Sequence, residues 1–362
     1  MKKITALLLA LFMLVGALAG CGKQNDTNQT DKLSIVTTIF PEYDWVREVL
    51  GDKADNAEIT MLLDNGVDLH SYQPTADDIV KISDCDLFIY VGGESDGWVE
   101  DALRNAANRN MKVINLLEVL GDSVKTEEIV EGMQEEEHEH EDAHAHDDAE
   151  EHEHEDAEEH EHEDAEEHEH EDILDELMGH DHGEEKDEHV WLSLKNAETL
   201  VTAIADALQE LDPNNKDIYA ANADAYVKKL SALDAEYQAA VDAASNKTIL
   251  FGDRFPFRYL VDDYGLRYYA AFVGCSAETE AGFDTISFLA KRVDEWKLPC
   301  VLTIEGAQHK IAETVVRNTT AKNQRVLTMD SMQSTTTQDV KNGTTYLSVM
   351  EKNLSVLKEA LR

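Results

Sequence analysis

Basic residues are scarce in this sequence. Its 362 residues include 31 Lys and Arg against 76 Asp and Glu, which gives a net charge of -45. Binding to nucleic acid requires clustered Lys and Arg that neutralise phosphates, and the sequence has no such cluster. The acidic excess is concentrated, because 30 carboxylates lie between Glu135 and Glu188 with Lys186 as the single basic residue among them. The charge pattern therefore argues against a nucleic-acid partner and favours cations.

A convincing general base beside a candidate metal ligand is also lacking. A metallohydrolase would combine His and carboxylate ligands with an open coordination position and a nearby base. We therefore expect a binding protein and not an enzyme, with a metallohydrolase as the less favoured interpretation.

Long apolar runs are confined to the N-terminus. Lys2 and Lys3 precede LLLALFMLVGALAG, which stops at Cys21, whereas a membrane-spanning helix needs about 20 apolar residues. This pattern predicts an export signal over 1–21, and its last letters, LAGC, resemble a bacterial lipobox in which Cys21 carries the lipid. The polar stretch 22–32 is expected to be a flexible tether. The protein should thus be anchored by lipid at the extracytoplasmic face of the cell membrane, on a Gram-positive-type cell surface or in a periplasm.

Cysteine is rare, with four residues in all. Once Cys21 is assigned to the lipid, three remain in a protein that is exported to a compartment where disulfides persist. Cys275 and Cys300 are the expected pair. Cys85 lies in the apolar run CDLFIYV and is expected to be a buried core thiol.

Short β-branched runs alternate with stretches of helical spacing. The runs lie at 33–38, 57–62, 86–93, 112–116, 248–252, 268–274, 300–305 and 325–330. This alternation predicts parallel sheets covered by helices on both faces. About 30 residues of uninterrupted helical spacing within 214–246 would span roughly 45 Å at 1.5 Å per residue. We expect two Rossmann-like α/β lobes, over 33–213 and 247–362, joined by one long helix.

The first lobe is interrupted by an acidic, His-rich tract at 134–187, in which AEEHEHED is written three times between 149 and 172. It lacks apolar periodicity and is expected to be an unpacked insertion. Its imidazoles are His138, His140, His144, His146, His152, His154, His160, His162, His168, His170, His180 and His182. In an extended chain, His at i and i+2 point to the same side. The tract is therefore expected to bind several metal ions weakly, with a merely solvating spacer as the alternative.

Polar side chains follow several predicted strands. They are His70, Asp253, Glu305 and Asp330, together with His189 just after the insertion. Ligands of open α/β sheets lie beyond the carboxyl ends of the strands, and mixed imidazole and carboxylate ligands suit Zn²⁺ or Mn²⁺. Each residue also has a structural explanation: His70 as a loop residue, Asp253 and Asp330 as helix caps, and Glu305 as a cap or a solvated side chain.

Five strings, in order, give a specific resemblance: IFPEYDWV, DLHSYQPTADD, DLFIYVGGESDGWVEDAL, HVWLSL and MDS. With the His-rich insertion before HVWL, they resemble the metal receptors of bacterial ABC importers, which are high-affinity zinc and manganese solute-binding proteins. The resemblance runs from Leu33 to Arg362. It implies two α/β lobes, a rigid connecting helix and a four-ligand metal site with little hinge closure, served by an ABC permease and its ATPase. A monomer is expected.

Carried over by motif, the resemblance implies that His70 and His189 are ligands. The sequence departs from the family at the third position, where GDRFPFRYLVDDYGL has neither His nor Glu before the aromatic residues, so Asp253 is the nearest match. Asp330 matches the fourth ligand of the manganese-type pattern, with Glu305 in reserve. Two carboxylates favour manganese, but the His-rich insertion is typical of zinc members. We expect a zinc receptor with an auxiliary zinc-collecting loop; a manganese receptor or a surface protein for metal buffering or adhesion are the alternatives.

Overall fold

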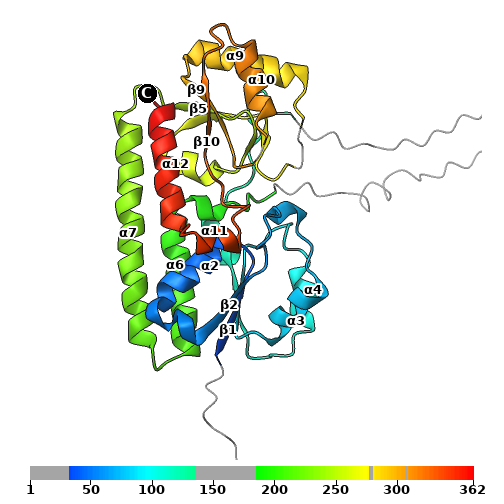
Figure 1. The fold of residues 1–362 in the computed structure, drawn as a ribbon, viewed down its shortest axis with the longest axis vertical. Coiled ribbons are helices and arrows are strands. Elements are labelled where there is room, and N and C mark those ends of the chain that lie inside the picture. Colours follow the sequence, from blue (N-terminus) through cyan, green and yellow to red (C-terminus); the bar gives the residue numbers. More distant parts are fainter. Residues whose placement is uncertain (1–31, 135–184, 277–279, 307) are drawn as a thin grey trace, which may run out of the picture.

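The structure is a computed structural model that describes residues 32–134, 185–276, 280–306 and 308–362 (Figure 1). The predicted signal peptide with Cys21, nearly all of the tether and the twelve imidazoles of the insertion lie outside the described residues. Among the residues that are described, no helix has both the length and the apolarity to cross a membrane.

The N-terminal lobe is built on a four-stranded parallel sheet in the order β2-β1-β3-β4. Its strands are β1 (Leu33–Thr37), β2 (Ala57–Met61), β3 (Leu87–Tyr90) and β4 (Lys112–Asn115). Helices α2 (Phe40–Leu50) and α6 (Leu194–Leu211) lie on one side of the sheet, and α3 (Ala76–Asp84) and α4 (Val99–Arg104) lie on the other (Figure 1). Short helices complete the lobe: η1 (Gly51–Asn56), η2 (Leu69–Ser71), α5 (Leu116–Leu120), η3 (Gly121–Ser123) and η4 (Val190–Leu192).

Local sequence explains where these helices begin. The Thr75 hydroxyl oxygen accepts a hydrogen bond from the Asp78 backbone N–H, and the Asp78 carboxylate accepts one from the Thr75 backbone N–H, which forms a capping box at α3. Ser193 caps α6 by accepting from the Asn196 N–H. These caps fix the loops that follow the strands, and those loops carry the candidate ligands.

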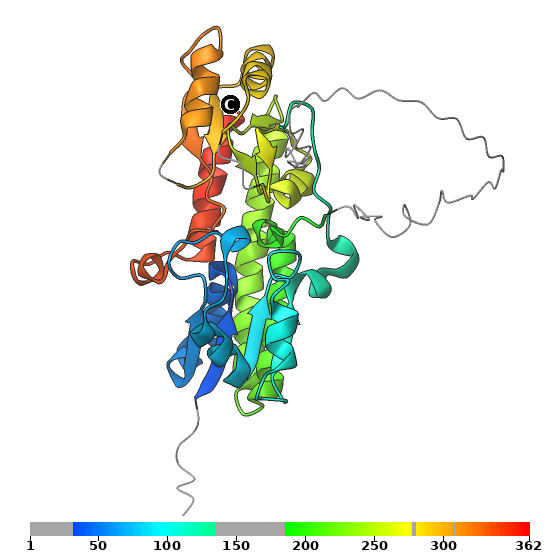
Figure 2. The same cartoon turned by 90° about the vertical axis from the view of Figure 1, so that its right-hand side faces the viewer.

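The long helix α7 (Lys216–Ala243) joins the lobes and runs along the height of the molecule (Figures 1 and 2). Its 28 residues correspond to about 42 Å at 1.5 Å per residue. It packs against α2 and α6 of the N-terminal lobe and against α8 (Arg258–Tyr264) and α12 (Tyr346–Ala360) at the other end. The predicted connecting helix is therefore present, with ends a few residues inside the expected range.

The C-terminal lobe contains three two-stranded parallel ladders. They are β5–β7 (Thr248–Leu250 and Arg267–Tyr269), β6–β8 (Arg254–Phe255 and Phe272–Val273) and β9–β10 (Cys300–Thr303 and Arg325–Thr328). A parallel bridge between Phe251 and Leu302 links the first ladder to the third. Helices α9 (Phe283–Trp296), α10 (Lys310–Asn318) and α11 (Thr337–Lys341) complete the lobe.

One hydrophobic core continues through both lobes and α7. It includes Val36 of β1, Leu230 of α7, Phe251 after β5 and Leu354 of α12. A second, smaller core lies in the C-terminal lobe beneath α9 and α10, around Leu289 and Val315. The larger core crosses the lobe boundary, so side chains of both lobes pack in one continuous core.

The two flanks of the His-rich insertion are packed into the fold. Thr126 and Lys186 form an antiparallel bridge, the Glu127 N–H donates to the Glu185 carbonyl (2.8 Å) and the Asp187 N–H donates to the Lys125 carbonyl (2.9 Å). The prediction had placed 185–187 in the unpacked insertion, and the structure differs there. The reason is that these residues form backbone hydrogen bonds with 125–127, a long-range pairing that charge composition does not reveal.

Candidate metal centre

His70 is presented by the loop that follows β2. It lies in the short helix η2, which Asp68 caps by accepting a hydrogen bond from the His70 N–H (3.0 Å). This places the ring at the carboxyl edge of the N-terminal sheet, as the sequence predicted.

His189 comes from the segment that re-enters the fold after the insertion. It precedes η4 and is fully buried, with its ring packed 5.3 Å from that of Trp191. The Trp191 indole N–H donates to the Ser331 carbonyl of the C-terminal lobe (2.8 Å). His189 therefore has a rigid position between the two lobes.

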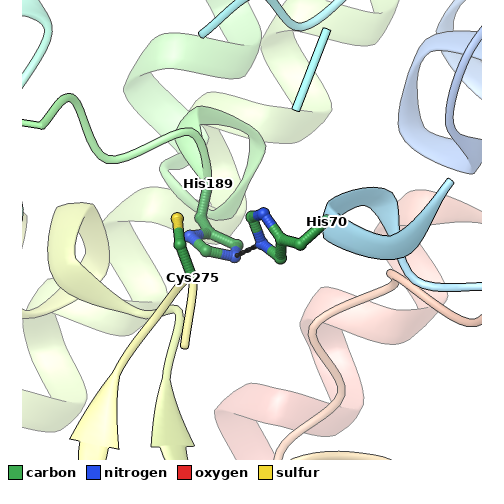
Figure 3. A group of neighbouring side chains, drawn as sticks. All are labelled: His70, His189 and Cys275. Atoms are coloured by element: carbon green, nitrogen blue, oxygen red, sulfur yellow. Dashed lines mark hydrogen bonds between the residues drawn. The ribbon is translucent and has the colours of Figure 1, made fainter. Parts of the chain in front are cut away.

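The Nε2 atoms of these two imidazoles face each other at 3.2 Å (Figure 3). Two imidazoles on one tetrahedral zinc ion, with Zn–N of about 2.0–2.1 Å, have their nitrogens roughly 3.3 Å apart. The pair therefore already has the spacing that a shared zinc ion requires.

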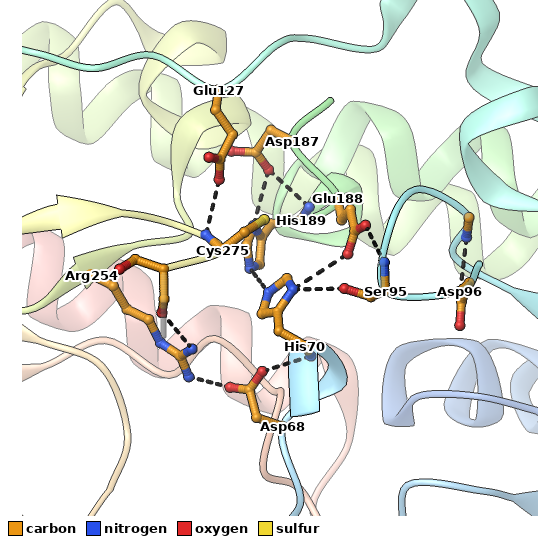
Figure 4. Close-up of polar contacts among 12 residues, drawn as sticks. Asp68, His70, Ser95, Asp96, Glu127, Asp187, Glu188, His189, Arg254 and Cys275 are labelled. Carbon is orange, nitrogen blue, oxygen red and sulfur yellow. Dashed lines mark hydrogen bonds and ion pairs between the residues drawn. The ribbon is translucent and has the colours of Figure 1, made fainter. Parts of the chain in front are cut away.

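Acidic and polar groups hold the other nitrogen of each ring (Figure 4). The Asp187 carboxylate lies 3.0 Å from His189 Nδ1, and it also accepts the His189 backbone N–H. The Ser95 hydroxyl lies 2.8 Å and the Glu188 carboxylate 3.4 Å from His70 Nδ1. The Asp187 carboxylate can only accept, so a neutral His189 donates from Nδ1 and keeps a lone pair on Nε2. His70 has the same tautomer when it donates from Nδ1 to Ser95 or Glu188. Metal-binding histidines are oriented in this way.

Glu188 is buried, and burial raises the pKa of its carboxyl. Hydrogen bonds from His70 and Ser95 outweigh this effect, so the pKa of Glu188 lies below its usual range. The site therefore contains a buried anion whose negative charge is available to a cation.

Cys275 is the third residue of a candidate ligand group with His70 and His189. Among the residues that the structure describes, the ligand atoms of His70, His189 and Cys275 all lie within 4.8 Å of one another (Figure 3). Cys275 follows β8 at the carboxyl end of its ladder, and its backbone N–H donates to Glu127 (2.9 Å). Burial and the nearby Glu127 raise the pKa of its thiol well above the usual range.

Two glycines allow the backbone to lie close to Glu188 and His189. Gly93 has a φ of +83°, and a Cβ there would lie 2.3 Å from Glu188 Oε1. A Cβ on Gly274 would lie 2.9 Å from both His189 Cε1 and the Phe255 carbonyl oxygen. A side chain at Gly93 would displace the Glu188 carboxylate, and one at Gly274 would displace the His189 ring.

Among the described residues, the group within 4.8 Å contains none of the three carboxylates that were predicted as ligands. Asp253 accepts hydrogen bonds from the backbone of Arg254 (3.0 Å) and Ile304 (3.3 Å). Asp330 accepts the Met332 N–H (2.8 Å), and burial together with Glu305 raises its pKa to about 6. Glu305 accepts from the Ser331 N–H and hydroxyl and from the Gln333 N–H. All three accept hydrogen bonds from backbone amides, but neither Asp253 nor Asp330 is the N-cap residue of a helix, as the capping alternative had suggested.

The expected disulfide between Cys275 and Cys300 is not formed, because both are free thiols. Cys300 is the first residue of β9, at the amino end of that strand, whereas Cys275 follows the carboxyl end of β8. The two strands also belong to different ladders, β6–β8 and β9–β10. Cys85 is a free and fully buried thiol, as predicted.

Arg254 and Gln333 occupy the C-terminal side of the site. Arg254 forms an ion pair with Asp68 across the lobe boundary. Gln333 lies between Asp68 and His189, with its side-chain amide 2.8 and 3.0 Å from the Asp68 oxygens and 3.0 Å from His189 Nε2. Neither contact was predicted, because both depend on how the lobes meet.

Ser95 lies in the string GESDG, which has the G-x-S-x-G pattern of serine hydrolases. A catalytic triad requires Ser on one ring nitrogen of His and the acid on the other. Here Ser95 and Glu188 share Nδ1 of His70, while Nε2 faces His189. The geometry around His70 therefore lacks the proton relay of a hydrolase. It matches the geometry expected of a candidate metal centre, in which Nε2 is directed at the ion.

A family model described as the periplasmic component A of zinc-uptake complexes (ZnuA) matches residues 35–360. The zinc-binding lipoprotein AdcA of Streptococcus pneumoniae is 32% identical over 359 residues, which cover 99% of this chain and 61% of that protein. The high-affinity zinc uptake system protein ZnuA of Bacillus subtilis is 27% identical over 356 residues, covering 97% and 95%. The chain thus spans about three fifths of the length of the AdcA lipoprotein.

Solved structures share the fold. The zinc-bound ZnuA-like domain of Streptococcus pneumoniae AdcA aligns with a TM-score of 0.63 at 27% identity, covering 91% of this chain and 99% of that domain. The metal-dependent lipoprotein YcdH of Bacillus subtilis aligns with a TM-score of 0.65 at 23% identity, covering 91% and 99%. The predicted two-lobed α/β architecture is confirmed.

Proposed function

Because the chain belongs to the family of periplasmic A components of zinc-uptake complexes, we propose that it is the extracytoplasmic solute-binding component of an ABC importer. It captures Zn²⁺ between its two lobes and delivers the ion to a membrane permease and its ATPase. The observation that carries this proposal is the pair of imidazole Nε2 atoms 3.2 Å apart, each with its Nδ1 hydrogen-bonded.

Capture at this pair follows from its electrostatics. Both Nε2 lone pairs point at one position, so the entering ion gains two ligands without a change of tautomer. The outer carboxylates of Asp187 and Glu188 offset part of the positive charge in a buried environment. Rigid ligands lose little conformational entropy on binding, which favours high affinity. The relatives are named zinc-binding, and this supports zinc as the transported ion.

We further propose that the His-rich insertion collects zinc for this site, and that Cys21 anchors the protein in the membrane through lipid. These roles depend on the twelve imidazoles and on the lipobox-like LAGC string. The insertion returns to the fold at Glu185, four residues before His189. Ions bound by the tract are therefore held near the high-affinity site.

The test is zinc titration of the full protein in competition with a chromophoric chelator. His70→Ala and His189→Ala should each abolish the high-affinity equivalent, lowering affinity beyond the 10–100-fold typical of losing an outer-shell partner. His309→Ala is the matched control, since His309 lies outside the His70–His189–Cys275 group. Retention of one tight equivalent by His70→Ala would contradict the assignment.

A further inference from the structure

We propose that Cys275 supplies the third zinc ligand as a thiolate, which makes the centre a His₂Cys site that selects zinc over manganese. This inference rests on the proposed function. It gives Cys275 the third ligand position, for which the sequence had suggested Asp253. When zinc binds, the thiol proton is released to bulk water and a Zn–S bond takes its place.

The first support is position. The sulfur lies within 4.8 Å of a ring nitrogen of each imidazole. A tetrahedral ion with Zn–N of about 2.0–2.1 Å and Zn–S of about 2.3 Å places nitrogen and sulfur roughly 3.5 Å apart. A change in the side-chain torsion of Cys275 would therefore bring its sulfur to the ion that the two imidazoles share.

The second support is how the backbone holds Cys275. Its N–H donates to Glu127, on the strand-like segment that pairs with 185–187 and so positions His189. The preceding residue, Gly274, lies against the His189 ring with no room for a Cβ. The thiol and the imidazole are thus held by the same local structure.

The third support is that the thiol completes the site across the lobes. His70 belongs to the N-terminal lobe and His189 to the segment at the boundary, while Cys275 belongs to the C-terminal lobe. Asp253 is instead engaged by two backbone amides, and the neighbouring Arg254 pairs with Asp68. Within the described residues, Cys275 is the C-terminal member of the candidate ligand group.

Selectivity follows from ligand chemistry. Thiolate is a soft ligand that suits zinc, whereas Mn²⁺ prefers oxygen ligands and has the lowest affinity in the divalent series. Replacing the predicted Asp253 and Asp330 oxygens by one sulfur therefore changes the expected preference from ambiguous to zinc. The carboxylates that lie close by, Asp187 and Glu188, act on the Nδ1 atoms.

Cobalt substitution tests the sulfur ligand directly. Co²⁺ bound to the full protein should show the intense near-ultraviolet charge-transfer absorption of a cobalt–thiolate bond, and Cys275→Ser should lose it. The matched controls are Cys85→Ala and Cys300→Ala, which remove thiols outside the group and should retain the band. Proton release provides a second measurement: when zinc binds at neutral pH, the unaltered protein should release a proton that Cys275→Ser does not release.

Zinc and manganese titrations then separate this inference from the proposed function. Cys275→Ser should bind zinc at least about 10-fold more weakly, and Cys275→Asp should lower the ratio of zinc to manganese affinity. If the unaltered protein binds one tight zinc that His70→Ala loses and Cys275→Ser keeps, with no thiolate band, Cys275 is not a ligand but the receptor function stands. If the unaltered protein has no tight zinc equivalent, the proposed function itself fails.

Discussion

Asp187, Glu188 and His189 follow one another in the chain, and all three act on the same pair of imidazole rings. Asp187 holds Nδ1 of His189, and Glu188 lies beside Nδ1 of His70. Both carboxylates are only 2% exposed, so water does not compete for these contacts. Three consecutive residues thus supply one candidate ligand and the carboxylates that lie beside both rings.

This arrangement predicts the effect of Asp187→Asn. The amide can present its nitrogen to Nδ1, which would move the ring proton to Nε2 and remove the lone pair needed by the metal. Zinc affinity should fall about 10- to 100-fold, as for other outer-shell partners, without unfolding. Competition titration measures the affinity, and the exposed Asp122→Asn is the control. Unchanged affinity in Asp187→Asn would show that Asp187 does not set the tautomer.

The sequence was informative about residues whose roles depend on local motifs. His70 and His189 were predicted as ligands because each stands in a recognisable string at a strand end or after the insertion, and the structure brings the two together. Cys275 also follows a strand, and this signal could have made it a candidate, but the exported setting suggested a disulfide instead. For Asp253 and Asp330 the sequence could not separate ligand from cap, because that choice depends on the direction of a side chain.

At the scale of elements, periodicity predicted the long helices better than the short pieces. The connecting helix was expected at 214–246 and is observed at Lys216–Ala243. The five-residue helices α5 and α11 were not predicted, since five residues do not establish a period of 3.6. The pairing of 125–127 with 185–187 was missed because it joins segments separated by the whole insertion.

The pairing of 125–127 with 185–187 determines which residues a loop deletion should keep. Removing 135–184 while keeping Glu185, Lys186 and Asp187 should leave one tight zinc equivalent with unchanged affinity, because the flanking hydrogen bonds stay intact. Total zinc stoichiometry, measured by equilibrium dialysis, should fall with the loss of the imidazoles. A variant with every His of 135–184 replaced by Asn is the matched control for loop length. Loss of the tight equivalent in either variant would contradict the separation of the two zinc-binding regions.

At the scale of the whole molecule, helix α12 joins the lobes a second time. It packs against α2 and α7 and against β9 and β10. At its first turn, the Tyr346 N–H donates to Asp44 of α2 (2.8 Å) and the Tyr346 hydroxyl donates to the Trp191 carbonyl (2.7 Å). With α7 and the continuous core, these contacts favour a receptor that binds zinc with little change in the angle between its lobes.

Asp44 makes the stability of this framework depend on pH. Burial raises the pKa of Asp44 to about 6, although the Tyr346 hydrogen bond opposes the shift, whereas an unfolded Asp has a pKa of about 3.9. The protonated form is therefore favoured in the folded state. Its contribution to stability is complete below about pH 3.9 and is lost as the pH rises to about 6.

Asp44→Asn should remove this pH dependence while its amide oxygen still accepts the Tyr346 N–H. The free energy of unfolding of the variant, relative to the unaltered protein, should rise by roughly 2–3 kcal/mol between pH 4 and pH 7. Urea denaturation of chelator-treated protein, followed by circular dichroism, measures the difference. Asp52→Asn, at an exposed position of η1, is the control. A difference that stays constant with pH would show that Asp44 is not the titrating group.

The bridge between Thr126 and Lys186 has a consequence for how the gene can vary. Because Lys186 pairs with Thr126, residues of the folded lobe set the position of His189. The position of that ring therefore does not depend on how many residues precede Glu185. Copies of AEEHEHED can therefore be gained or lost, eight codons at a time, without shifting His189. The number of imidazoles in the tract can change in this way while the position of the candidate metal centre stays constant.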